Sequence, residues 1–114
     1  MPIDGSVAPY AALSSIVYTP NESVEALKYF ASLDGLKGKY GFTDSYNFEE
    51  EEYYSESYLG IDKGPTIIML ENFLNGTIWK YFMQSDVCKR AIANLEFTKV
   101  EDNYLDFTRE NLLK

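Results

Sequence analysis

The stretch Tyr58–Met83, YLGIDKGPTIIMLENFLNGTIWKYFM, decides the fold of this chain. Pro65 suits the first position of a helix, where a missing N–H costs nothing. The apolar residues that follow recur at helical spacing, at Ile67, Leu70, Leu74, Ile78 and Tyr81. Further apolar residues widen this stripe beyond that of a one-sided surface helix. We therefore expect one mostly buried helix of about four to five turns, with Trp79 in the core.

Composition limits the functions open to the chain. Its 114 residues are 46% hydrophobic, which suffices for one small domain with a core, residues 1–114. Eighteen acidic and ten basic residues give a formal charge of −8, so nucleic acid and anionic membrane surfaces are unsuitable partners. Glu71, Asn72 and Lys80 interrupt the apolar stretch, which therefore does not read as a transmembrane span.

The residue types present also limit the chemistry. The chain has no His and a single cysteine, Cys88, which rules out an internal disulfide and a Cys-based zinc site. We expect no metal, no cofactor and a buried Cys88 thiol, so any acid–base chemistry falls to Asp, Glu or Tyr. No signal peptide is visible, and the location of this chain stays open.

On the N-terminal side, Ala8–Val17 is small and apolar and predicts a short, close-packed helix. Thr19-Pro20-Asn21-Glu22 has the pattern of a capping box and predicts the start of a second helix, which Asp34-Gly35 ends. Leu36–Asn47 favours a loop or a short irregular hairpin, because glycines alternate with aromatic and turn residues. The acidic run Glu49–Glu52 indicates a solvated loop.

On the C-terminal side, Ser85 or Asp86 can cap a helix that continues to Asn94. Phe97 follows as an expected apolar anchor. Asp102 or Asn103 could then cap a final helix to Leu113, so residues 98–114 form an extension that we expect to be helical.

Candidate functional residues concentrate in two segments that precede helices. One, YGFTDSYN, carries Tyr40, Phe42, Asp44 and Asn47, and the other, YSESYLGIDKGP, carries Glu56, Tyr58 and Asp62; Glu71 lies further along the central helix. Carboxylates beside aromatic rings are typical of carbohydrate sites, and a glycoside hydrolase needs two acids flanking one bond. The alternative, at about even weight, is that Asp44 and Asp62 merely cap turns or helix starts.

Three segments in fixed order resemble the bacterial glycoamylase-like family, which includes endo-β-1,2-glucanases and a domain of cyclic β-1,2-glucan synthases. They are APYAALSSIVYTPNESVEALKYF, YGFTDSYNF and YSESYLGIDKGPTIIMLENFLNGTIWKYFM. The YLGID-x-GP motif and the G-x-I-W-K-x-F-M ending make this resemblance specific, and it covers residues 7–97. It implies a mainly α fold, the C-terminal fragment of an (α/α)6 toroid, with four to five helices and two Gly- and aromatic-rich loops.

The resemblance also implies roles for the candidate residues. Asp62 would be catalytic, and the other candidates would bind an oligosaccharide or β-glucan: Tyr40, Phe42, Asp44, Asn47, Glu56, Tyr58 and Glu71. The loops Leu36–Asn47 and Tyr53–Gly64 would then converge on one cleft. Lys63 stands where the family usually has Gln, and Leu74 where it commonly has Arg.

Length separates two functional hypotheses. A six-hairpin toroid needs about twelve helices, so the chain would lack the N-terminal part of the catalytic domain, with at least one of its two acids. The first hypothesis is a segment of a β-glucan-active glycoside hydrolase, whose full-length relatives we expect in the periplasm or outside the cell. The second is a non-catalytic remnant or binding module with no hydrolase activity alone.

A toroid segment also leaves helix faces without partners, here along Ala8–Val17 and part of the central helix. We expect homo-oligomers through these faces, because large apolar patches are rare on soluble monomers. The alternative is a compact monomer in which Asp102–Lys114 folds back over them.

Overall fold

The chain is mainly α-helical, as predicted. A computed structural model describes residues 4–49, 52–97 and 110, and this part contains five α-helices and two small hairpins. The helices are α1 (Pro9–Ser14), α2 (Pro20–Ser32), α3 (Gly60–Leu74), α4 (Thr77–Met83) and α5 (Asp86–Asn94). A 3-10 turn, Asp34–Leu36, leads into the strands β1 (Lys37–Gly38), β2 (Gly41–Phe42), β3 (Tyr46–Asn47) and β4 (Tyr53–Tyr54).

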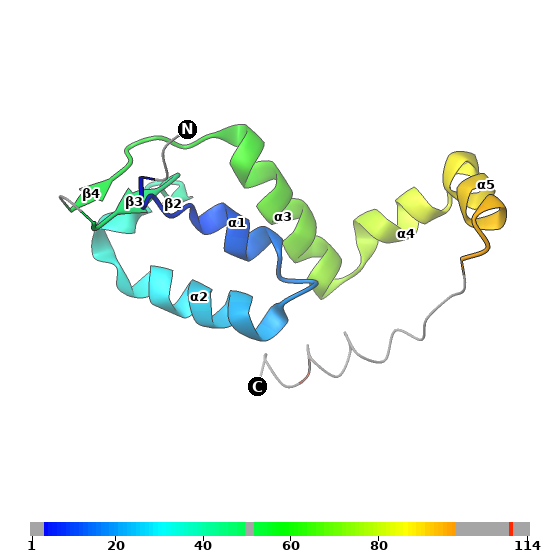
Figure 1. Cartoon of the computed structure of the whole chain (residues 1–114), viewed down its shortest axis with the longest axis horizontal. Coiled ribbons are helices and arrows are strands. Elements are labelled where there is room, and N and C mark those ends of the chain that lie inside the picture. Colours follow the sequence, from blue (N-terminus) through cyan, green and yellow to red (C-terminus); the bar gives the residue numbers. More distant parts are fainter. Residues whose placement is uncertain (1–3, 50–51, 98–109, 111–114) are drawn as a thin grey trace.

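Helix α1 lies between α2 and α3 and packs against both (Figure 1). Small residues permit this close approach: the Ser23 hydroxyl, itself buried, donates to the carbonyl of Ala12 at 2.8 Å. Ile16 and Val17 form one core cluster with Phe73 of α3, and Trp79, predicted to lie in the core, is partly buried and packs against this cluster. The prediction that Ala8–Val17 exposes an unpartnered face is therefore wrong, because α2 and α3 cover it.

Helix α2 begins at Pro20 and ends at Ser32, as predicted, but the capping box does not form. The Thr19 hydroxyl donates instead to the carbonyl of Ser15 at 3.2 Å, within the turn that leaves α1. The backbone N–H of Ser23 is satisfied by the Thr19 carbonyl at 2.9 Å. The local turn thus competes successfully for the threonine side chain.

The predicted single central helix is two helices. Helix α3 begins at Gly60, so Pro65 lies inside it rather than at its first position. It ends at Leu74 because Gly76 adopts a left-handed φ of 69°, a conformation that ends helices and favours glycine. Helix α4 then starts at Thr77, and α4 and α5 extend away from the rest of the molecule (Figure 1).

These helices are also less buried than predicted. On α3 only Asn72 and Phe73 are buried, and α4 and α5 have no buried residue. The exposed apolar residues from α3 to the end of α5 form what we call the α3–α5 stripe: Ile61, Ile67, Ile68, Leu74, Ile78, Tyr81, Phe82, Met83, Val87, Leu95 and Phe97. The predicted anchoring role of Phe97 is wrong, since it is 66% exposed. In the described part of the chain, no helix has the length and apolarity to cross a membrane.

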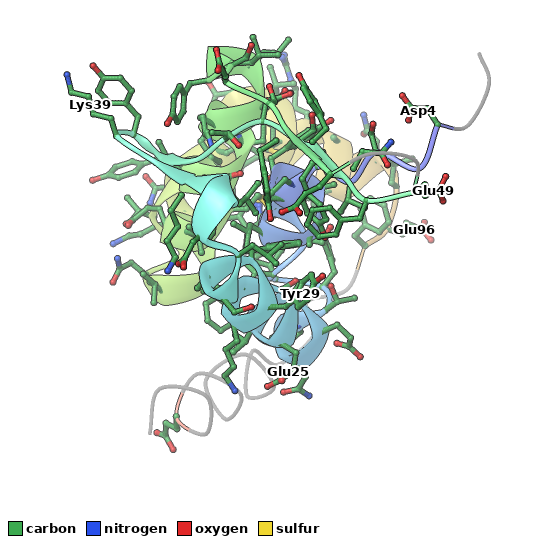
Figure 2. All side chains as sticks on the ribbon, turned by 90° about the vertical axis from the view of Figure 1, so that its left-hand side faces the viewer. Asp4, Glu25, Tyr29, Lys39, Glu49 and Glu96 are labelled. Atoms are coloured by element: carbon green, nitrogen blue, oxygen red, sulfur yellow. The ribbon has the colours of Figure 1, made fainter. Side chains whose placement is uncertain are left out.

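The segment Leu36–Asn47 forms the short hairpin that its glycines predict. β1 pairs with β2 in antiparallel fashion, Lys37 opposite Phe42 and Gly38 opposite Gly41, where Gly41 has a φ of 90°. Figure 2 shows Lys39 at the outer tip of this hairpin, projecting away from the body of the molecule. A second core cluster, formed by Phe30, Leu36 and Tyr46, packs against Phe42 and Tyr54 of the two hairpins.

The second hairpin, β3–β4, was not anticipated. Tyr46 lies opposite Tyr54, and Val7 adds a bridge on the other side of Tyr46. The acidic run falls in the β3–β4 connection, where Glu49 and Glu52 are exposed as predicted and residues 50–51 lie outside the described part.

Helix α5 spans Asp86–Asn94, as predicted, and the Ser85 hydroxyl accepts the N–H of Cys88 at 3.3 Å. Cys88 is only partly buried, because α5 is not packed against the core. The final helix predicted from Asp102 or Asn103 lies outside the described residues.

Candidate functional site

The two candidate segments run side by side. The N–H of Asp44 donates to the carbonyl of Ser57 at 3.0 Å, and the N–H of Ser55 donates to the carbonyl of Ser45 at 2.9 Å. These bonds prolong the β3–β4 pairing toward α3 and bring the residues before Tyr46 next to those before Tyr58. The predicted convergence of the two loops is confirmed.

The carboxyl groups of Asp44 and Asp62 meet at this junction. Asp62 lies in the first turn of α3 rather than in a loop, close enough to Asp44 to affect the pKa of the Asp44 carboxyl group. Burial, followed by the hydrogen bond and the charge of Asp62, raises the pKa of Asp44, and the Lys63 cation acts in the opposite direction. Oδ1 of Asp44 is buried and has no donor among the described residues.

Lys63 joins the hairpin to α3. Its Nζ donates to the carbonyl of Phe42, 21 residues earlier in the chain, and lies 5.9 Å from the centroid of the Tyr58 ring. In the sequence, Lys63 stood out only as a departure from the family pattern. Its position in the chain did not predict the contact with the Phe42 carbonyl.

Two tyrosine rings of the candidate segments pack against each other. Tyr58 is partly buried and its hydroxyl lies against Gly38, so close that a Cβ at Gly38 would be 1.6 Å from it. The Tyr40 ring meets the Tyr58 ring edge-on at 5.4 Å between centroids and is 68% exposed. An exposed ring supported by a fixed one is suited to packing against a flat ligand face.

Phe42 and Glu56 lie near the pair but differ in their surroundings. The Phe42 ring packs edge-on against Phe30 at 6.1 Å and so belongs to the core, while its carbonyl binds Lys63. Glu56 is exposed on the segment that leads to Tyr58.

Two predicted site residues lie elsewhere. The Asn47 side-chain amide donates to the carbonyl of Asp4 and, at 3.4 Å, to the Ser6 hydroxyl, so it fastens the N-terminal segment to β3. Glu71 lies nine residues after Asp62 on α3, about 13 Å along the helix axis at 1.5 Å per residue. The structure therefore groups Asp44, Asp62, Tyr58, Tyr40 and Phe42, and does not bring Asn47 or Glu71 to them.

Glu71 acts at the junction between α3 and α4. Its carboxylate accepts hydrogen bonds from the Thr77 hydroxyl at 2.6 Å and from the Asn75 amide at 3.0 and 3.1 Å. These bonds, that of Thr77 first, lower the pKa of Glu71. Asn72 completes the junction, because its side-chain oxygen accepts the N–H of Trp79 at 3.0 Å. Among the described residues, no group of three His, Cys, Asp or Glu side chains could hold a metal ion.

The described part of the chain combines a mainly helical fold with two neighbouring aspartates and two packed tyrosine rings. The chain belongs to the glycoamylase family described as "Putative glucoamylase", whose family model matches residues 1–86.

Characterised relatives agree with this assignment. The chain is 32% identical over 98 residues to an exo β-1,2-glucooligosaccharide sophorohydrolase (non-reducing end) of Parabacteroides distasonis, covering 84% of this chain and 14% of that protein. Among solved structures, it is similar to an endo-β-1,2-glucanase from Chitinophaga pinensis in complex with sophorotriose and glucose. The identity is 39% and the TM-score 0.73, and the match covers 83% of this chain and 23% of that protein. It is also similar to a protein from Bacteroides uniformis named as a putative glucoamylase, with 45% identity and a TM-score of 0.73. This match covers 80% of this chain and 22% of that protein. The chain thus spans between 14% and 23% of these relatives' lengths.

Proposed function

We propose that this chain is a carbohydrate-active segment of a glycoside hydrolase that acts on β-glucan, with β-1,2-linked glucose as the substrate. The observation that carries the proposal is that one end of the fold brings together the neighbouring Asp44 and Asp62 and the packed Tyr40 and Tyr58 rings. The activities named for two relatives support the choice of linkage.

The residues suit a sugar ligand. Carboxylate oxygens accept hydrogen bonds from sugar hydroxyls, and burial raises the pKa of Asp44, so this group keeps its proton to higher pH than an ordinary aspartic acid. The exposed face of Tyr40 provides an apolar surface for the C–H groups of a glucose ring. Asp62 would be the acid nearest to the reacting bond, with Asp44 as its hydrogen-bonding partner.

The pair does not supply both acids of a hydrolase. Retaining enzymes place their two carboxyl groups about 5 Å apart and inverting enzymes about 6.5–9.5 Å apart, so that the scissile bond fits between them. Asp44 and Asp62 are close neighbours that influence each other's charge, so in this proposal they act as one unit on one side of a bond. In this proposal the opposing acid comes from the part of the catalytic domain that the relatives have beyond the matched segment.

A second candidate function follows from the same arrangement. A segment with one acid unit can bind a glucan without cleaving it, which would make the chain a non-catalytic binding module. Hydrolysis by the chain alone separates the two functions: release of reducing sugar from β-1,2-glucan requires both acids, whereas binding requires only the cleft.

Binding itself is tested by titrating the ¹⁵N-labelled chain with sophorotriose and, in parallel, with the β-1,3-linked trisaccharide laminaritriose. We expect sophorotriose to shift the amide signals of Phe42, Asp44, Tyr58 and Asp62, and to bind at least fivefold more tightly than laminaritriose. Asp62→Asn and Asp44→Asn should weaken binding, while Asp34→Asn, a control at an exposed acid, should not. Absence of any shift with wild-type protein at millimolar sophorotriose would refute the proposed binding site.

A further inference from the structure

The Lys63 side chain, like the Tyr58 ring, links the two halves of the candidate site. It is partly buried at the start of α3, beside Asp62, and its Nζ reaches over to the carbonyl of Phe42 on β2. Phe42 is two residues before Asp44, so this bond fixes the strand that presents the Asp44 carboxyl group. The bond therefore controls how far the strand stands from α3.

The charge of Lys63 has a separate effect. Two carboxyl groups in contact repel each other once both ionise. The charged and titratable groups that face Asp44 are Asp62 and Lys63 from α3, and the Tyr58 ring lies beside the Lys63 ammonium. Lys63 is thus the cation that offsets the negative charge of the pair.

We propose that Lys63 is a positioning residue, which holds Asp44 and Asp62 together as one ligand-binding unit through its bond to the Phe42 carbonyl and its charge beside the pair. The ligand is the β-glucan of the proposed function, on which this part of the inference rests. The holding of the carboxyl pair is a property of the free protein and can be tested without a sugar.

Three substitutions separate the two effects. Lys63→Arg keeps a cation and a donor, Lys63→Gln removes the charge but keeps a polar end, and Lys63→Met keeps only the length and apolar stem. Lys39→Gln is the matched control. This substitution also removes one positive charge, but from the exposed tip of the β1–β2 hairpin (Figure 2).

The first readout is carbon-detected NMR titration of the Asp44 carboxyl group in the 114-residue chain. We expect its midpoint to rise in Lys63→Gln and Lys63→Met, since the cation that favours ionisation is gone, and to stay in place in Lys63→Arg and Lys39→Gln. The second readout is hydrogen exchange of the Asp44 amide, which bonds to Ser57. Exchange should accelerate at least tenfold in Lys63→Met and change less than threefold in Lys63→Arg.

The third readout is sophorotriose affinity, which should fall at least fivefold in Lys63→Met and recover to within twofold in Lys63→Arg. An unchanged Asp44 midpoint together with unchanged amide exchange in Lys63→Met would overturn the positioning role. If the variant does not fold, Lys63→Gln gives the same test of the midpoint. If the wild-type chain binds no sugar, the proposed function fails, and the first two readouts still decide the role of Lys63.

Discussion

Replacing Asn72 with Ala should destabilise the chain at the junction of α3 and α4. Asn72 is 1% exposed, and its side-chain oxygen accepts the N–H of Trp79, one of the N-terminal amides of α4 that have no partner within the helix. Alanine cannot accept this bond, and its smaller side chain also leaves a cavity where the amide packed.

The structure sets the size of the effect. An unsatisfied donor that is out of reach of water costs about 1–3 kcal/mol, and loss of a helix cap costs about 0.5–2 kcal/mol, but both figures describe the same N–H and do not add. Some packing against the core is lost as well. We therefore expect the free energy of unfolding to fall by about 2 kcal/mol, which for a chain of this size lowers the Tm by roughly 6–10 °C.

Urea unfolding followed by tryptophan fluorescence measures this change directly, because Trp79 is the only tryptophan and packs against the core. Asn75→Ala is the control: Asn75 belongs to the same junction but is exposed, so the cost should stay below about 0.5 kcal/mol. Equal losses for the two variants, or no loss for Asn72→Ala, would refute the assignment of Asn72 as the buried cap of α4.

Three further predictions follow from the structure. Because the pKa of Asp44 is raised, the folded state holds this proton more tightly than the unfolded state, so the free energy of unfolding falls as pH rises from 3.8 through the raised pKa. Asp44→Asn should therefore gain stability relative to wild type over that range. A difference in the free energy of urea unfolding that does not change with pH would contradict this. Gly38→Ala should displace the Tyr58 ring and lower the free energy of unfolding by about 1 kcal/mol. Gly64→Ala should instead stabilise α3 by up to about 1 kcal/mol, because no atom lies within 4 Å of the added methyl group. Similar urea midpoints for the two variants would argue against the contact between Gly38 and Tyr58. The α3–α5 stripe should pair between copies at micromolar concentration in sedimentation equilibrium, and Ile67→Glu should weaken the pairing; a monomer mass for wild type would disprove it.

Local signals in the sequence predicted the elements whose formation depends on nearby residues. Ser85 caps α5, Pro20 begins α2, and the glycines of Leu36–Asn47 produce a hairpin, because each feature is decided within a few positions. The convergence of the two candidate segments also followed, since their shared residue types and the family resemblance placed them at one end of the fold.

The errors have a common physical origin in the central helix. Its apolar spacing indicated burial, but spacing shows only that a helix has an apolar face, not that another element covers it. Asn75-Gly76 is a strong helix-ending signal that the continuous apolar pattern obscured, and the side chains of Glu71 and Asn72 stabilise the resulting break. In the same way, no pattern could reveal that Lys63 reaches the Phe42 carbonyl, because that contact depends on the tertiary placement of β2.

The proximity of Asp44 and Asp62 links the shape of the chain to its chemistry. In the proposed function, a single acid unit with an exposed aromatic ring would form one wall of a glucan-binding site, and the α3–α5 stripe leaves further helix faces of the chain exposed. Both features leave side chains exposed that another layer of helices could cover. If such a layer carries the opposing acid, adding it to the chain should confer hydrolysis of β-1,2-glucan and cover the stripe in the same step, so that activity and protection of the exposed isoleucines from solvent rise together. Activity without such protection would separate the two features and place the opposing acid elsewhere.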